Sequence, residues 1–164
     1  MAIWQFKVVL IPRRWLESGV SLVALADNER DDFSDAWRGV DCSGLEEAID
    51  AMLPKGKSLS PSLTTWGSSQ GDEIQLWRGR GVKSLGVRFD LRNPNMALFS
   101  AVIALVQRFD LAILTPGRVR MAATDITSLL RAAAESDAAH FVIDPQSFLS
   151  ELEAPDSNTT GLLS

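Results

Sequence analysis

The stretch GVRFDLRNP, residues 86–94, decides the expected fold because apolar and charged residues alternate along it. Positions 87, 89 and 91 are apolar, and the intervening and following positions carry Arg88, Asp90 and Arg92. Successive side chains of a β-strand point to opposite faces of its sheet. We therefore expect residues 87–92 to be extended, with the apolar set facing the core and Asp90 lying between two guanidinium groups on the other face.

The segments next to this stretch extend the pattern. EIQLW, residues 73–77, also alternates, and the turn residues RGRG that follow it predict an antiparallel hairpin. Asn93 and Pro94 then predict the start of a helix, because asparagine favours the N-cap and proline the first helical position. The wide apolar face from Leu98 to Phe109 indicates that this helix is largely buried.

Further strands are expected on both sides of these elements. Residues 3–11 and 111–115 are apolar and predict two strands, and residues 119–122 would form a hairpin partner or an edge strand. The apolar run at 20–26 is either a strand or a buried turn of helix, since periodicity cannot separate the two in so short a run.

The remaining helices are predicted from their start signals. A short helical turn is expected over 13–19, and the capping-box pattern of Ser43 and Glu46 predicts a helix that ends near residue 52 or 53. Two more helices are expected to begin at Thr124 or Asp125 and at Asp144-Pro145.

Together these elements predict an α+β fold, a mainly antiparallel sheet with two or three helices packed on one face. The 164 residues can bury a core without metals or disulfides, and we expect one domain over 1–153 and a flexible tail over 154–164.

No segment approaches the roughly 18 to 20 apolar residues that span a bilayer, and the single cysteine indicates no disulfide. We therefore expect a cytoplasmic protein that does not bind membranes.

The charge distribution restricts the partners. The net charge of −5 argues against nucleic acid, because contacts to phosphate need a basic surface. Residues 27–50 hold nine carboxylates and only two arginines. They do not form a calcium loop, because glycine and glutamate are missing at its sixth and twelfth positions. This acidic region is either a solvated surface or a surface that attracts a basic partner.

The charged row and the hairpin before it form the candidate binding site. Its simplest interpretation is a solvated sheet face with weak ion pairs. The alternative is a face that binds a protein partner or an anion, to which the hairpin would add Trp77, Arg78 and Arg80.

Catalytic signals are few. A nucleophilic cysteine needs a base, usually histidine, and nothing in the sequence places His140 near Cys42. One histidine and one cysteine cannot build the usual zinc sites, and the P-loop and GxGxxG motifs are absent. We expect no catalytic residues, no metal and no cofactor.

The runs WGSSQGDEIQLW, VRFDLRNPNMALFSAVIALVQRFDLAILT and SDAAHFVIDPQSFL resemble a pattern in small single-domain bacterial α+β proteins. The resemblance covers about Trp66 to Leu149, and its motifs are a glycine turn, an Arg-Asn-Pro junction and an Asp-Pro helix start. Some small bacterial proteins of this kind are immunity proteins, which bind and neutralise a toxin. The resemblance carries no catalytic residue.

Two functions remain as hypotheses. The first is a non-enzymatic, immunity-like domain that binds a protein partner through the acidic region or the Arg/Trp face of the hairpin. The second is a small enzyme or ligand-binding domain with a site around Arg88, Asp90 and Arg92, completed by Trp66 or Trp77, which would need a concave pocket. A homodimer paired through the edge of the sheet is a third arrangement compatible with the sequence.

Overall fold

The structure is a computed structural model that describes residues 2–18, 32–115 and 124–153. Three of the expectations above lie outside these residues: the apolar run at 20–26, the strand at 119–122 and the C-terminal tail at 154–164.

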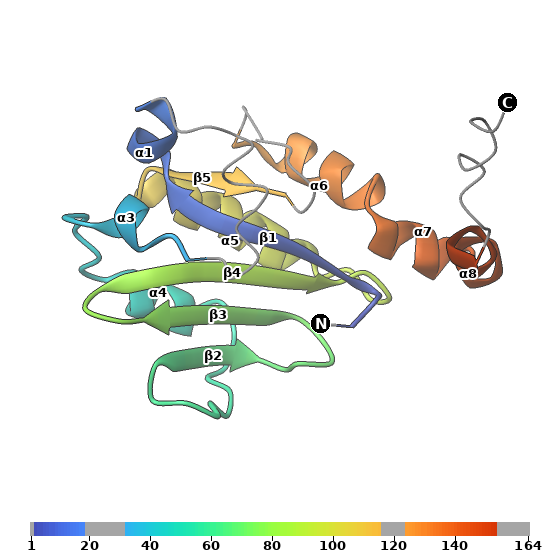
Figure 1. Ribbon diagram of the computed structural model, residues 1–164, viewed down its shortest axis with the longest axis horizontal. Helices are drawn as coiled ribbons and strands as arrows, with labels where there is room; N and C mark the ends of the chain where they lie inside the picture. Colours follow the sequence, from blue (N-terminus) through green and yellow to red (C-terminus); the bar gives the residue numbers. More distant parts are fainter. Residues whose placement is uncertain (1, 19–31, 116–123, 154–164) are drawn as a thin grey trace, which may run out of the picture.

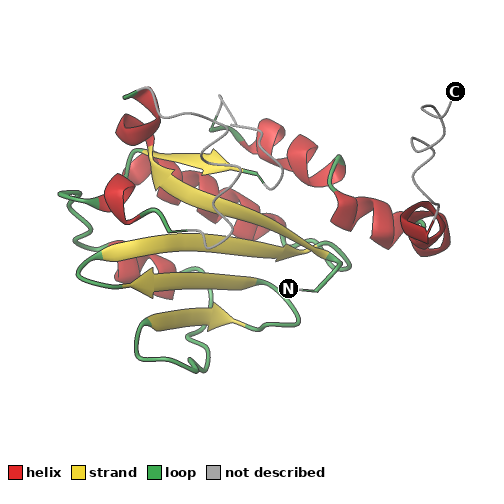
Figure 2. Ribbon diagram, in the orientation of Figure 1, coloured by secondary structure: helices red, strands yellow, loops and turns green. Residues whose placement is uncertain are grey.

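The described chain forms an α+β fold around one five-stranded sheet (Figure 1; Figure 2). The strand order is β2-β3-β4-β1-β5, and every pair of neighbours is antiparallel. The expected antiparallel sheet and its hairpin are therefore confirmed. The strands are β1 (Gln5–Pro12), β2 (Leu63–Gly67), β3 (Glu73–Arg78), β4 (Val82–Asp90) and β5 (Leu111–Leu114).

Seven helices are described, so the expected number of two or three is too low. Three of them have only four to six residues, which is less than two turns and too short for an apolar stripe to repeat. None of the described helices is long and apolar enough to cross a membrane. The helices are α1 (Arg13–Glu17), α3 (Ser34–Trp37), α4 (Leu45–Asp50), α5 (Met96–Arg108), α6 (Ile126–Ala134), α7 (Asp137–Ile143) and α8 (Pro145–Glu153).

The alternation of β4 determines which face of the sheet is the core. Val87 and Phe89 are almost fully buried, as expected, and so is Leu85 on the same face, whereas Leu91 is only partly buried against the core. Phe89 lies opposite Phe6 of β1 and stacks on Phe99 of α5, with ring centroids 6.0 Å and 4.1 Å apart. Helix α5 therefore covers the face of the sheet to which these side chains point, and the charged residues of β4 point to the opposite face.

The observed helix starts agree with those predicted from the sequence in two cases and differ from them in two. Asp125 accepts a hydrogen bond from the Ser128 amide at 2.7 Å, and Asp144 accepts one from the Ser147 amide at 3.0 Å. Helix α5, however, is capped by Asn95 and not by Asn93. Helix α4 has Gly44 as its N-cap, so the predicted capping box does not form.

Candidate functional site

The charged row of the sequence separates into two ion pairs. Arg88 donates to the Glu73 carboxylate at 2.8 Å across the β3–β4 ladder. Asp90 instead accepts from the Arg92 guanidinium, at 2.8 Å and 3.0 Å. Asp90 therefore pairs with one arginine and does not lie between two, because strand β4 ends at Asp90 and the chain turns back at Arg92.

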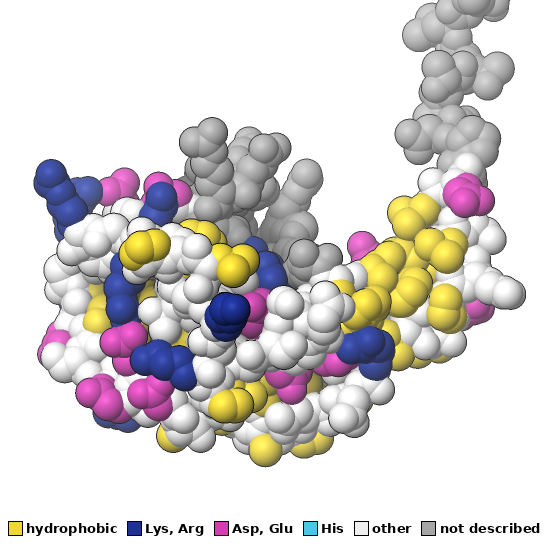
Figure 3. Space-filling view, turned by 90° about the horizontal axis from the view of Figure 1, so that it is seen from below, with side chains coloured by type: hydrophobic (Ala, Val, Ile, Leu, Met, Phe, Trp, Pro, Cys, Tyr) yellow, Lys and Arg dark blue, Asp and Glu magenta, His cyan; other side chains and the backbone are white. Residues whose placement is uncertain are grey.

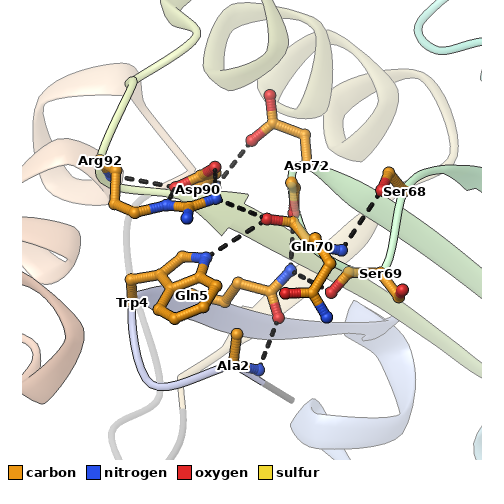
Figure 4. A network of polar contacts seen from close by, with 10 residues as sticks. Ala2, Trp4, Gln5, Ser68, Ser69, Gln70, Asp72, Asp90 and Arg92 are labelled. Carbon is orange, nitrogen blue, oxygen red and sulfur yellow. Dashed lines mark hydrogen bonds and ion pairs between the residues drawn. The ribbon is translucent and has the colours of Figure 1, made fainter.

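The Asp90–Arg92 pair belongs to a network that joins three segments of the chain (Figure 4). The Arg92 guanidinium also donates to the Gln70 carbonyl at 2.7 Å and lies over the Trp4 ring, 4.1 Å from its centroid. The Gln5 side-chain amide donates to the Gly71 carbonyl at 2.6 Å. We call this network the clasp, because it ties the β2–β3 turn to the N-terminal segment and to the end of β4.

Two carboxylates of the clasp have opposite pKa shifts. Hydrogen bonds from Arg92 lower the pKa of Asp90 below its usual range. Burial raises the pKa of Asp72, although this carboxylate accepts a hydrogen bond from the Asp90 amide at 2.8 Å. The contacts of the clasp are internal to the protein, which favours a structural role for Asp90 and Arg92.

This role predicts a pH dependence. A carboxyl whose folded-state pKa is lowered stabilises the protein above its unfolded-state pKa, and this contribution is lost as the pH falls through the folded-state value. Replacing Arg92 by methionine should therefore lower the free energy of unfolding at neutral pH. Between about pH 5 and pH 2, the free energy of unfolding of this variant should fall less than that of the wild type. Urea unfolding across this range measures both effects, and Asp72 contributes with the opposite sign in both proteins.

Arg38→Met is the matched control, because the ion pair of Arg38 with Asp35 is 79% and 74% exposed. Its pH profile should follow that of the wild type. If the profile of Arg92→Met did the same, Arg92 would not be the cause of the lowered pKa of Asp90.

Arg88 lies in a different place, a hollow on the face of the sheet opposite α5. The hollow has a volume of about 310 Å³, and we call it the cationic hollow. Strand pairing assembles it, since Lys7 is the direct partner of Arg88 and Gln75 the partner of Gly86. Its lining residues are Lys7, Gln75, Trp77, Lys83, Ser84, Gly86 and Arg88.

A β-bulge brings Lys83 into this hollow. Trp77 pairs with Ser84 and Arg78 pairs with Val82, so Lys83 is the extra residue of β4. A bulge places two consecutive residues opposite a single partner and can redirect a side chain. As a result Lys83 and Ser84 both line the hollow, although strict alternation would send them to opposite faces.

Arg78 and Arg80 line another cavity, at the end of the sheet where the β3–β4 turn meets α3 and α4. This hairpin groove has a volume of about 1040 Å³, and its walls also include Trp37, Cys42 and Glu46. Arg78 and Glu46 form an ion pair of 2.6 Å across it. Acidic and basic side chains lie close together at this end of the molecule, the left end in Figure 3.

The structure thus distributes the six predicted binding residues over three places. Trp77 and Arg88 line the cationic hollow, Arg78 and Arg80 line the hairpin groove, and the remaining pair, Asp90 and Arg92, forms part of the clasp. Trp66, which the second hypothesis included, is fully buried and donates to the Asp50 carboxylate at 2.7 Å.

Cys42 and His140 lie in different parts of the fold, Cys42 in the loop between α3 and α4 and His140 on α7. Cys42 lines the hairpin groove, and burial raises the pKa of its thiol, with a further contribution from Asp41. His140 belongs to α7, where it packs against Phe148 and lies 3.9 Å from the Glu151 carboxylate. Within the described residues, no group of three or more His, Cys, Asp or Glu side chains could hold a metal ion.

Sequence reasoning did not find Lys7, Gln75 and Ser84 as site residues. The alternation of β3 places Gln75 on the same side as Trp77, but Lys7 enters through the pairing of β1 with β4, which joins residues far apart in the chain. Neither a protein-family model, nor a curated protein, nor a solved structure matches this chain.

Proposed function

We propose that the protein is a non-enzymatic, immunity-like domain that binds a protein partner, and that this partner docks over the hairpin groove with a basic surface facing the acidic residues around it. The observation that carries the proposal is the groove itself. It joins Arg78 and Arg80 of the hairpin to the α3–α4 part of the acidic region, two surfaces that the sequence suggested separately.

The charge around the groove favours a basic partner. Residues 32–50 carry six carboxylates and one arginine, Arg38. The wall of the groove itself holds three arginines, Arg38, Arg78 and Arg80, against Glu46 and Glu47, so the acidic excess lies around the groove. Glu46 pairs with Arg78 at 2.6 Å. Clustered charge of one sign speeds the encounter with an oppositely charged protein and selects against like-charged ones.

The chemistry of the groove supports a contact surface more than a catalytic centre. A nucleophilic cysteine needs a lowered pKa or a neighbouring base. The pKa of Cys42 is raised, and its thiol donates to the Val40 carbonyl at 3.6 Å. His140 belongs to α7, an element that contributes no residue to the groove.

A photo-crosslinking amino acid on the groove wall tests the proposal by capturing whatever protein docks there. One variant carries the crosslinker in place of Arg80 on the groove wall, and the control carries it in place of Leu59, which is 91% exposed and outside the groove. In lysate of the source cell, the Arg80 variant should capture one protein that the Leu59 variant does not. Production of the captured protein alone should stop growth, and co-production of this chain should restore it.

The captured protein then allows a kinetic test. Glu47→Lys should lower its association rate constant by roughly threefold to tenfold at low salt, and added salt should reduce the difference. Glu135→Lys is the matched control, because it makes the same charge change at the end of α6. Equal association rates for the two variants, or no groove-specific capture, would contradict the proposal.

A further inference from the structure

We propose that the cationic hollow binds a small organic anion, one that carries several negative charges on a flat ring. This site is separate from the hairpin groove. The hollow is lined by Gln75 and Trp77 of β3, whereas the groove is lined by Leu76 and Arg78 of the same strand. Alternation along β3 therefore places the two sites on opposite faces of one hairpin.

The charge of the hollow points to an anion. Three of its lining residues are cations and none is acidic, in a protein whose net charge is −5. The counter-ion of Arg88 is Glu73, which does not line the hollow and whose side chain is only 7% exposed. Lys83 is 3.7 Å from Asp32, and its side chain is 44% exposed. A pocket lined by charges of one sign concentrates ligands of the opposite sign.

The side chains of the hollow are held in position before any ligand arrives. Glu73 binds Arg88 at 2.8 Å and also accepts from the Gln75 amide at 3.2 Å, which fixes both groups against the sheet. The Arg88 Nε atom is buried and has no hydrogen-bond partner. Preorganised donors lose little conformational entropy on binding, so they add to affinity.

The shape of the hollow suggests the flat ring. Ser84 and Gly86 are buried and form its floor, while Trp77 stands at its wall with 39% of its surface exposed. An exposed indole offers a flat apolar surface on which an aromatic ring can stack. A volume of about 310 Å³ is at the lower end of the range for small-molecule sites.

Calorimetry on the full chain with four probes tests the proposal. Adenosine monophosphate and benzene-1,2,4-tricarboxylate combine a ring with charge, and they represent nucleotide and carboxylate ligands. Adenosine has the ring alone, and inorganic phosphate has the charge alone. At least one ring-bearing anion should bind more tightly than adenosine and phosphate, and its affinity should fall as salt is added.

Two variants locate the binding by independent means. Lys83→Met removes one charge and should lower the affinity roughly tenfold. Gly86→Val fills the floor, and it should also lower the affinity at least about tenfold. The backbone at Gly86 has room for a side chain to start, because a Cβ atom there would lie 3.8 Å from its nearest neighbours, an ordinary contact. Lys57→Met, at an exposed lysine outside the hollow, should bind as the wild type does.

The proposal is overturned if neither ring-bearing anion binds at millimolar concentration, or if binding is unchanged in both Lys83→Met and Gly86→Val. Glu47→Lys, which alters the hairpin groove, should leave this binding intact. The failure of one site is thus distinguishable from the failure of the other.

Discussion

Replacing Phe89 by alanine is expected to lower the free energy of unfolding by about 3–5 kcal/mol. Phe89 is 1% exposed and lies between the rings of Phe6 and Phe99, with its centroid 4.1 Å from that of Phe99. Its removal leaves a cavity at the contact between β1, β4 and α5, and the two remaining rings can close it only in part. Urea or thermal unfolding measures the loss.

Phe141→Ala is the matched control, because Phe141 lies on α7 and is only half-buried. Its ring centroid lies 5.9 Å from that of Phe148. We expect a loss of about 1 kcal/mol there, in keeping with the smaller apolar area removed from water. Equal losses for the two variants would mean that the stack of three rings is not the centre of the core.

Replacing Glu73 by leucine is expected to cost about 3 kcal/mol, because it leaves Arg88 charged and without its counter-ion. The two side chains are 7% and 18% exposed, so water cannot fully replace the lost contact. The double variant Glu73→Leu/Arg88→Met should regain most of this loss, since burying two apolar side chains in place of an ion pair is often neutral. Urea unfolding of Glu73→Leu, Arg88→Met and the double variant completes a double-mutant cycle, which measures the interaction between the two side chains.

Glu46→Leu provides the comparison for a half-exposed ion pair. It breaks the contact of Glu46 with Arg78, whose side chains are 40% and 39% exposed, and should change stability by only about 0–1 kcal/mol. If Glu73→Leu were equally mild, the Glu73–Arg88 pair would not be what holds Arg88 in the cationic hollow.

Much of the fold could be predicted because the sequence patterns that specify it involve residues close together in the chain. The alternation of residues 87–92 and the glycines at 79 and 81 predicted strand β4 and its hairpin with β3. Asp125 and Asp144 predicted two helix starts, because a cap depends on an amide only three residues away.

The errors at helix starts arose where two local signals compete. Asparagine stands on both sides of Pro94, and helix α5 uses the second, Asn95, whose side chain accepts from the Leu98 amide at 3.1 Å. At α4, the Asp41 side chain accepts from the Ser43 amide at 2.9 Å, and Gly44 adopts a φ of +81°. This turn places Gly44, in place of Ser43, at the N-cap.

The candidate sites could be predicted only in part, because pairing between distant strands creates them. Trp77 and Arg88 were recognised from the hairpin, but Lys7 joins them through the β1–β4 ladder. Lys83 enters through a bulge, and a one-residue irregularity leaves no periodic signal in the sequence. Arg80 was assigned to the same face as Trp77, but the hairpin divides the two between its opposite sides.

The interior position of β1 in the sheet, between β4 and β5, has a consequence for synthesis on the ribosome. Its partners in β4 and β5 lie roughly 75 to 105 residues later in the chain, and such distant pairing slows folding. The apolar run VVLI of β1 therefore emerges well before β4 and β5, and it has no strand partner until β4 has been translated. During this interval the nascent chain exposes an apolar strand with unpaired backbone groups, and a chaperone that holds this strand should raise the yield of folded protein.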